Sequence, residues 1–222
     1  MTTDAFEMAL VHRVFRRELG NASYLIGGVA AGDKTRSGLI ATHLGHMLAA
    51  LHHHHAAEED LLWPKLHTRV SLRDNDVVRM EAQHAGIAES VEKVESLRVL
   101  WATSAEPRFA RQLRAAVEEL AANVNEHLED EDCNVVPLIN EHINADEWAE
   151  CIERGAAFLP KMNVRMALVF VGLVLQDATP AEQQLLLAGI PLPPRVLWRL
   201  LGKRTFESYR TTLYGSADAP QR

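Results

Sequence analysis

The 222-residue chain has few cysteines, few aromatic residues and no long apolar segment, and each shortage excludes a class of protein. Because Cys133 and Cys151 are the only cysteines, neither a disulfide framework nor a Cys-x-x-Cys metal site is available. The longest apolar run, residues 166–175, is about half of the ~20 residues that a membrane-spanning helix needs. The sequence does not open with a basic start and an apolar export segment. We therefore expect a soluble, cytoplasmic protein.

The charge of the chain is acidic and unevenly distributed. The net charge is −7, with −11 in residues 1–159 and +4 in residues 160–215. Nucleic-acid binders release phosphate counterions through many Lys and Arg side chains, so a nucleic-acid partner is not expected. Hydrophobic residues make up 47% of the chain and aromatics only 6%, with alanine and leucine abundant, which favours helices.

Three short breaks divide the first part of the chain into four long segments. The breaks lie at residues 32–33, 70–71 and 104–107. Helix-start signals accompany them: Ser71 and Asp74 have the capping spacing, and Pro107 suits the first turn of a helix. Long helices joined by short turns are typical of an up-down bundle. We expect an all-α fold, with a four-helix bundle in residues 1–143 and additional C-terminal helices in residues 144–222.

Apolar residues in each segment repeat at spacings of three and four, the pattern of a buried helix face. In every segment this face is interrupted by histidine, and in the second and fourth also by glutamate. The interrupting residues are His12, His54, Glu58, His84, His127 and Glu131. A single buried histidine usually only hydrogen-bonds a neighbour, but a buried unpaired carboxylate is costly. Four histidines and two carboxylates in one core therefore predict a pair of metal ions that neutralises them.

Counting from the turns places the four histidines at one height. Residues equally far from a turn lie at the same level of an antiparallel bundle. His12 and His54 lie 21 residues on either side of the first turn, and His84 and His127 lie 21 and 22 residues on either side of the third. At ~1.5 Å of rise per residue, the four imidazoles fall within a few ångströms of one level.

The order His…His-x-x-x-Glu occurs twice in the chain. Two helical hairpins, each with this order of residues, would give each metal two histidines, while Glu58 and Glu131 would bridge both metals. Imidazole and carboxylate ligands without thiolate suit iron, manganese or zinc, and a carboxylate-bridged pair inside a bundle favours iron. A ferritin-like site needs Glu-x-x-His on two helices, and only residues 81–84 fit that motif.

These six residues and their spacing resemble the hemerythrin (HHE cation-binding) family. The string His-His-Ala-Ala-Glu-Glu-Asp-Leu-Leu-Trp-Pro, residues 54–64, is similar to the second-helix signature of that family, and the resemblance covers residues 4–143. It implies two Fe ions, oxo- or hydroxo-bridged, that meet O2, H2O2 or NO. The extension resembles the tails of hemerythrin-like proteins of actinobacteria.

The third helix departs from the oxygen-carrying members of this family, which use two histidines one turn apart there. The neighbours of His84 at that spacing are Met80 and Ala88, so one ligand is absent. Fewer protein ligands leave more open coordination positions, which favours chemistry with peroxide or nitric oxide over reversible O2 storage.

In the fourth helix the carriers use an aspartate, and Asp132 occupies its place. We prefer Glu131 as the ligand because it continues the buried face, and Asp132 is the alternative. A seventh ligand is left open between Glu81, Asp132 and water.

The remaining histidines and the cysteines are given simpler interpretations. His43 and His46 either line a channel to the metals or, by default, lie at the surface. Surface residues or supports of the ligands are expected at His52, His53, His55 and His67. Cys133 and Cys151 are interpreted as packing residues.

The C-terminal extension carries helix signals of its own. Thr179 and Glu182 have the capping spacing, and the prolines of residues 191–194 separate that helix from a last one at about residues 196–213. We expect these helices to cover the bundle or a partner in a homodimer. The alternative is a basic amphipathic surface for an anionic membrane.

The leading hypothesis is a di-iron protein that binds or disproportionates small oxidants, with catalase-like removal of peroxide as the first activity to test. No catalytic residue is identified beyond the metal ligands. One alternative is a non-enzymatic oxygen or iron sensor or store. Another is a purely structural metal, which would be zinc.

Overall fold

The computed structural model describes residues 3–70 and 74–215 of the chain. Regular structure in these residues is entirely helical, which confirms the expected all-α class. The chain forms two compact units, residues 1–157 and residues 158–222. One residue of the capping pair expected at Ser71 and Asp74 lies outside the described residues.

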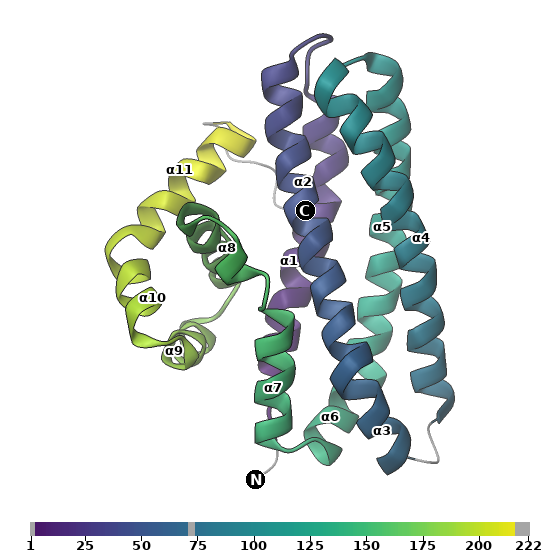
Figure 1. The fold of residues 1–222 in the computed structure, drawn as a ribbon, viewed down its shortest axis with the longest axis vertical. Coiled ribbons are helices and arrows are strands. Elements are labelled where there is room, and N and C mark those ends of the chain that lie inside the picture. Colours follow the sequence, from purple (N-terminus) through teal and green to yellow (C-terminus); the bar gives the residue numbers. More distant parts are fainter. Residues whose placement is uncertain (1–2, 71–73, 216–222) are drawn as a thin grey trace. The chain divides into compact units, whose positions relative to one another are not determined.

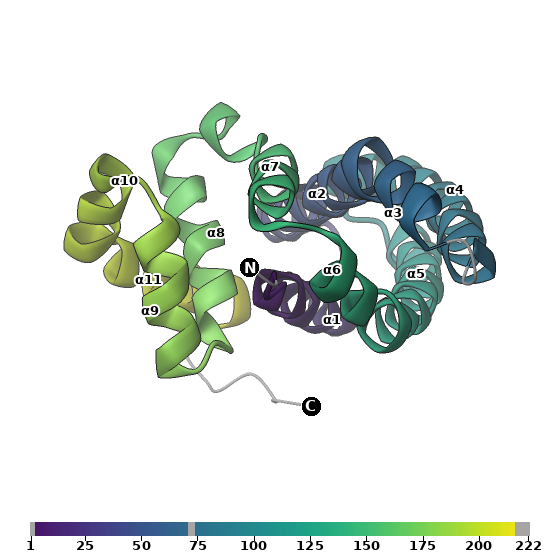
Figure 2. The ribbon, with the colours of Figure 1, turned by 90° about the horizontal axis from the view of Figure 1, so that it is seen from below.

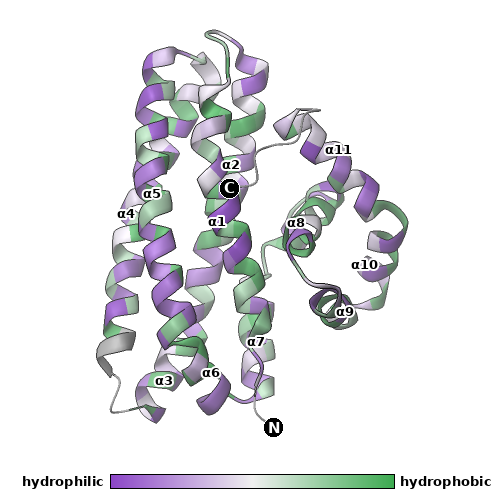
Figure 3. Ribbon diagram, turned by 180° about the vertical axis from the view of Figure 1, so that it is seen from behind, coloured by the Kyte–Doolittle hydropathy of each residue, from purple (hydrophilic) through white to green (hydrophobic). Residues whose placement is uncertain are grey.

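The first unit is built on four long helices. They are α1 (Phe6–Gly27), α2 (Lys34–Ala57), α4 (Asp74–Ser104) and α5 (Pro107–Asn134). Helix α1 packs against α2 and α5, and α4 packs against the same two helices (Figures 1 and 2). Hydrophilic positions recur along the visible faces of α4 and α5, as expected for helices with one buried stripe (Figure 3). The predicted up-down four-helix bundle is therefore confirmed.

Two of the predicted breaks form a joined pair of turns at one end of the bundle. Asp33 caps α2 by accepting a hydrogen bond from the backbone N–H of Arg36 at 2.9 Å. Pro107 begins α5, where its missing N–H costs nothing. The N–H of Gly32, whose φ is 81°, donates to the carbonyl of Ala105 at 3.0 Å and links the two turns. The turn of the α1–α2 hairpin and the turn of the α4–α5 hairpin therefore lie at the same level of the bundle.

The second helical segment is not one regular α-helix, although the sequence predicted an uninterrupted one. After α2 comes a π-helical turn, η1 (Glu58–Leu62), and then α3 (Trp63–Arg69). The N–H of Trp63 bonds the carbonyl of Glu58, five residues back. A π-turn inserts one extra residue and shifts which side chains face the core. This shift occurs beside the residues expected to bind metal.

One end of the bundle is closed by α3 and two further short helices, α6 (Val136–His142) and α7 (Ala145–Gly155). Asn144 caps α7 in a capping box with Glu147. Arg69 of α3 makes two hydrogen bonds to Glu147, at 2.6 and 2.7 Å. Apolar side chains fill the interior of this end: Met8, Leu62, Trp63, Leu66, Met80, Val135, Leu138, Ile139, Trp148 and Cys151.

Helix α7 packs against α2 and η1, so the first compact unit continues beyond residue 143. Its amphipathic face supplies Trp148 and Cys151 to the apolar cluster, and Arg154 bonds Asp60 of η1 at 2.6 Å. The change in composition after residue 143 therefore does not coincide with the structural boundary. The role of residues 144–222 as an extension that covers the bundle or a partner stays a prediction.

The second unit contains η2 (Leu159–Lys161), α8 (Val164–Gln176), α9 (Pro180–Gly189), α10 (Leu192–Leu197), η3 (Trp198–Gly202) and α11 (Lys203–Tyr214). The predicted helix start at Thr179 is confirmed by its capping box with Glu182. The last helical stretch begins at Leu192, earlier than predicted, because a helix accepts prolines in its first turn. Within the described residues, no helix is both long and apolar enough to span a bilayer.

Helix α8 is mostly apolar and packs against α11 at a glycine. A Cβ atom added to Gly172 would lie 2.3 Å from Cγ and 2.7 Å from Cβ of Phe206. The Cβ atom of Phe206 is fixed to the α11 backbone, so the two helices can approach this closely only at glycine.

We therefore expect Gly172→Ala to lower the stability of the second unit by about 1–3 kcal/mol, the usual cost of overpacking. Gly189→Ala in α9 is the matched control, because its added methyl group meets no atom within 4 Å. Thermal unfolding followed by circular dichroism measures both. Equal melting temperatures for the two variants would contradict this account of the α8–α11 contact.

Candidate metal centre

The six residues predicted to hold metal come together in one layer of the bundle. The ligand candidates are His12 in α1, His54 in α2, Glu58 in η1, His84 in α4, and His127 and Glu131 in α5. The side chain of His54 is 12% exposed, and each of the other five residues is at most 3% exposed. The residues selected from the sequence thus share the interior of the core.

Their ligand atoms form two groups. The first group consists of His12, His54 and Glu131, with one ligand atom of each residue within 4.8 Å of the others. Nε2 of His12 lies 3.3 Å from Nε2 of His54. Ligands of one ion with bonds of about 2.0–2.2 Å lie roughly 3 Å apart when they are adjacent. The spacing of these two imidazoles therefore suits a shared metal ion.

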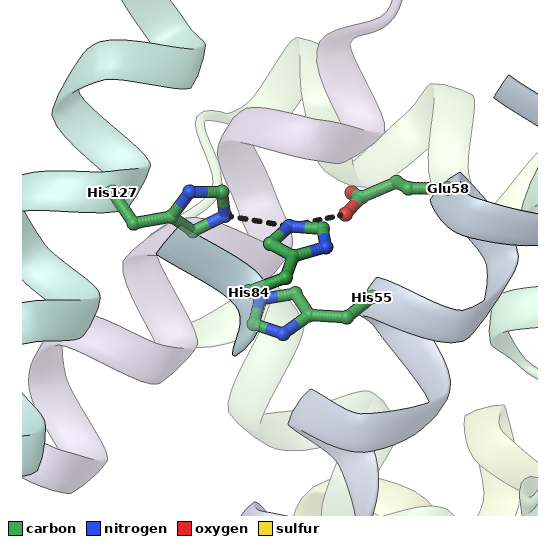
Figure 4. A group of neighbouring side chains, drawn as sticks. All are labelled: His55, Glu58, His84 and His127. Atoms are coloured by element: carbon green, nitrogen blue, oxygen red, sulfur yellow. Dashed lines mark hydrogen bonds and ion pairs between the residues drawn. The ribbon is translucent and has the colours of Figure 1, made fainter. Parts of the chain in front are cut away.

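The second group consists of Glu58, His84 and His127, and the neighbouring His55 lies within the same 4.8 Å limit (Figure 4). Nε2 of His84 lies 3.2 Å from Nε2 of His127. Each group thus contains two facing imidazoles from one hairpin repeat and a carboxylate from the other.

The two glutamates connect the groups. Glu58 places Oε1 3.1 Å from Nε2 of His54 in the first group and Oε2 3.5 Å from Nε2 of His84 in the second. Glu131 places Oε2 3.3 and 3.6 Å from the Nε2 atoms of His12 and His127. Each carboxylate therefore faces one histidine in the first group and one in the second, which is the arrangement that a bridging ligand needs.

Polar partners on the outer side of three imidazoles determine which nitrogen faces inward. The Nδ1 atoms pair with carboxylate or amide oxygens: His12 with Asp132 at 2.7 Å, His84 with Glu59 at 3.1 Å and His127 with Gln83 at 3.2 Å. Because oxygen atoms of this kind accept hydrogen bonds, each Nδ1 carries the proton. The Nε2 atom of each neutral ring then turns a lone pair inward, as in metal-ligating histidines.

Lone pairs therefore face one another in the centre of the layer. Both oxygens of Glu58 are buried and accept no hydrogen bond from the described residues. A buried carboxylate that faces unprotonated nitrogens is strongly destabilised unless a cation lies between them. The donor set fits a transition-metal ion with a preference for imidazole and carboxylate.

Burial keeps most of these imidazoles neutral. It lowers the pKa of His54 to about 3 and the pKa values of His84 and His127 to about 4. His12 differs: burial alone would lower its pKa, but the adjacent carboxylates of Asp132 and Glu131 raise it. Neutral imidazoles have free lone pairs for metal at physiological pH.

The two carboxylates respond to burial in opposite ways. Burial and the negative charge of Glu131 raise the pKa of Glu58 well above its usual value. Burial would also raise the pKa of Glu131, but contact with His12 lowers it to about 2. The layer thus holds at least one carboxylate charge that needs compensation.

Two histidines for which the sequence analysis favoured or allowed a surface position are buried. His55 is only 7% exposed, and its ring stacks on that of His84 with centroids 3.9 Å apart. His43 is 2% exposed, and its Nε2 lies 3.0 Å from Oε2 of the buried Glu18. The default assignment of His43 to the surface was wrong. The α-helical spacing of His54 and Glu58 gave no reason to turn His55 inward.

The two alternative carboxylates lie outside the ligand groups. Asp132 bonds the outer nitrogen of His12 and also pairs with Arg16 at 2.9 Å. Glu81 has a side chain that is 47% exposed and contacts His67 at 3.3 Å. Glu131 therefore remains the preferred carboxylate on α5, with Asp132 as a support for His12.

The cysteines divide between two environments. Cys151 belongs to the apolar cluster, which confirms its interpretation as a packing residue. Cys133 is exposed, so its interpretation as a packing residue was wrong.

The comparison with protein families agrees with this geometry. The model of the hemerythrin HHE cation binding domain matches residues 4–139, well over half of the chain. The chain therefore belongs to the hemerythrin HHE cation-binding family, and the buried layer of histidines and glutamates is its candidate metal site. None of the curated proteins or solved structures matches it.

We expect Glu58→Gln to change the stability of the metal-free and metal-loaded proteins in opposite directions. Without metal, burial raises the pKa of Glu58, so at neutral pH folding must either bury its charge or take up a proton. The amide removes this cost, so the chelator-treated variant should be about 1–4 kcal/mol more stable than the chelator-treated wild type. With metal, the variant should lose most of the stabilisation that binding confers on the wild type.

Melting temperatures with a chelator and with added iron test this expectation. Glu89→Gln, at an exposed position of α4, is the control and should leave both melting temperatures unchanged. A Glu58→Gln protein that is destabilised in chelator as much as in iron would contradict a metal-compensated role for this carboxylate.

Proposed function

We propose that this chain is a non-haem di-iron protein that binds or reacts with small oxidants, namely O2, H2O2 or NO. The observation that carries the proposal is the position of Glu58 and Glu131, each of which faces a histidine of both ligand groups. A single ion would need one group and no spanning carboxylate. Two groups joined by two spanning carboxylates support a pair of ions.

The proposed ligands divide evenly between the ions. His12 and His54 would hold one ion, His84 and His127 the other, and Glu58 and Glu131 both. The cation-binding family and the set of imidazole and carboxylate donors support iron. When bound, an iron pair supplies Lewis acidity and electron transfer to small oxidants.

The residues around the layer support this role by positioning ligands and limiting water. Asp132, itself paired with Arg16, orients the imidazole of His12 through Nδ1. The ring of Phe15 lies 5.4 Å from that of His54, and the ring of Trp63 lies 5.8 Å from that of His84. Apolar rings beside the imidazoles limit the access of bulk water to the layer.

A second candidate function is a non-enzymatic oxygen or iron sensor or store. Residues 158–222 lie outside the match to the cation-binding domain and form a compact unit of their own. Leu192 and Leu200 in this unit are 69% and 72% exposed, close in sequence to Arg195 and Arg199. An exposed apolar and basic surface suits contact with a partner that would respond to the state of the metals. A second copy of this chain is one such partner.

Metal analysis and reactivity of the purified protein test the proposal. We expect two irons per chain, a charge-transfer spectrum that changes with azide or nitric oxide, and O2 evolution on addition of peroxide. Glu131→Gln should lose at least one iron because it removes a carboxylate from both groups. Glu126→Gln, at an exposed position of the same helix, should keep both.

The outcomes separate the candidates. Spectral changes without turnover of peroxide would favour the sensor or store. Stoichiometric zinc and no iron would contradict the di-iron proposal and support a structural metal.

A further inference from the structure

The last helical stretch of the second unit exposes a line of aliphatic side chains. Helices α10, η3 and α11 follow one another without a break, from residue 192 to residue 214 (Figure 1). Within this stretch Leu192, Val196 and Leu200 are 69%, 48% and 72% exposed. They are spaced four residues apart, so they lie along one face of the helix. Large apolar groups gathered at a surface mark a contact with another molecule or with a membrane.

Basic side chains flank this line. Arg199, Lys203 and Arg204 are exposed, and none of them forms an ion pair with another described residue. Arg199 precedes Leu200 by one position, whereas Lys203 and Arg204 follow it by three and four and lie near it on the helix surface. Residues 183–206 contain no Asp or Glu. The α10–α11 face, defined as residues 192, 196, 199, 200, 203 and 204, is thus apolar along its centre and positively charged beside it.

The composition of the α10–α11 face favours a lipid surface over a protein partner. Protein interfaces are enriched in aromatic residues, and Leu and Val are under-represented among the residues that carry their binding energy. In the described part of the second unit, the exposed large apolar residues are all Leu or Val. Such side chains need no matching shape in the fluid boundary of a bilayer. The charged ends of neighbouring Lys and Arg side chains stay among the lipid headgroups while their stems lie along apolar groups.

The stretch is suited to lie along a bilayer and not to cross it. Among residues 3–70 and 74–215, no helix combines the length and the apolar character that a membrane span requires. Phe206, Tyr209 and Leu213 of α11 are buried, and α11 packs against α8. The exposed line on α10 and η3 is therefore free to enter a lipid interface while α11 stays attached to its own unit.

We propose that the α10–α11 face binds the surface of a membrane that contains anionic lipids. Its aliphatic side chains enter the boundary between headgroups and acyl chains, and its cations contact the lipid phosphates. Residues 1–159 carry a net charge of −11, so the same lipids repel them and the attraction comes from the second unit. The inference goes beyond the proposed function, because it needs no metal ion.

Sedimentation of the full-length chain with lipid vesicles tests the proposal. Vesicles made of equal parts of phosphatidylglycerol and phosphatidylcholine should bind the wild type, whereas vesicles of phosphatidylcholine alone should not. Added salt should weaken the binding, because it screens the attraction between exposed charges. Equal binding to both kinds of vesicle, or binding to neither, would overturn the proposal.

The double variant Arg199→Gln/Lys203→Gln tests the role of the cations. Each cation near an anionic surface is expected to contribute about fivefold in affinity, so the variant should bind about 30-fold more weakly. Lys34→Gln/Arg111→Gln is the matched control, because it removes the same charge from exposed positions of the first unit and should bind like the wild type. Equal losses in the two double variants would contradict a specific role for the α10–α11 face.

The variant Leu200→Gln tests the apolar contribution. Its affinity for the anionic vesicles should fall by at least about tenfold, because a leucine no longer leaves water on binding. The control is Leu100→Gln, at an exposed position of α4, which should bind like the wild type. Wild-type affinity in Leu200→Gln would contradict the insertion of this line into lipid.

Sedimentation velocity without lipid separates the membrane from a second copy of this chain as the occupant. The same oligomeric state in the wild type and in both variants of the face, with lipid binding weakened only in the variants, supports the proposal. A wild-type dimer that dissociates in both variants would overturn it, because the face would then bind another chain. Iron content should be equal in all these proteins, so the result does not depend on the proposed function.

Discussion

The structure depends on how the bundle compensates two carboxylates in a layer where imidazole lone pairs also point inward. Glu58 and Glu131 are at most 1% exposed and face Nε2 atoms of histidines from all four long helices. The outer nitrogens of His12, His84 and His127 face acceptors and carry protons, so their inner nitrogens turn lone pairs toward the carboxylates. In the proposed function, metal ions between the groups would remove this conflict. The same ions would tie the two hairpins together and so couple metal binding to bundle stability.

The regularity of the bundle explains why so much of the site could be predicted from the sequence. His12 and His54 lie equally far from a short turn, so an antiparallel pair of helices places them at one level. The i, i+4 spacing of His127 and Glu131 puts both on one face of α5. Neither inference needs knowledge of side-chain contacts. The family resemblance adds the expectation that the metal is iron and that it meets small oxidants, but it gives no atomic positions.

The features that could not be predicted arise where regular periodicity ends. The π-turn that begins at Glu58 changes the helical register after that residue, and a regular 3.6-residue repeat does not predict such a change. His55 is buried beside His54, although the repeat predicts that one of two neighbours faces solvent. The domain boundary was placed by composition after residue 143, yet α7 packs on α2 because Trp148 and Cys151 form its apolar face. The burial of His43 depends on Glu18, a residue on another helix that no local pattern connects with it.

The most direct test of the compensated layer is a crystal structure of the iron-loaded chain with anomalous diffraction data collected at the iron edge. Two anomalous peaks inside the bundle, each in contact with oxygen atoms of both Glu58 and Glu131, are predicted. No peak in this layer, or iron bound only at exposed histidines such as His52, would contradict the account.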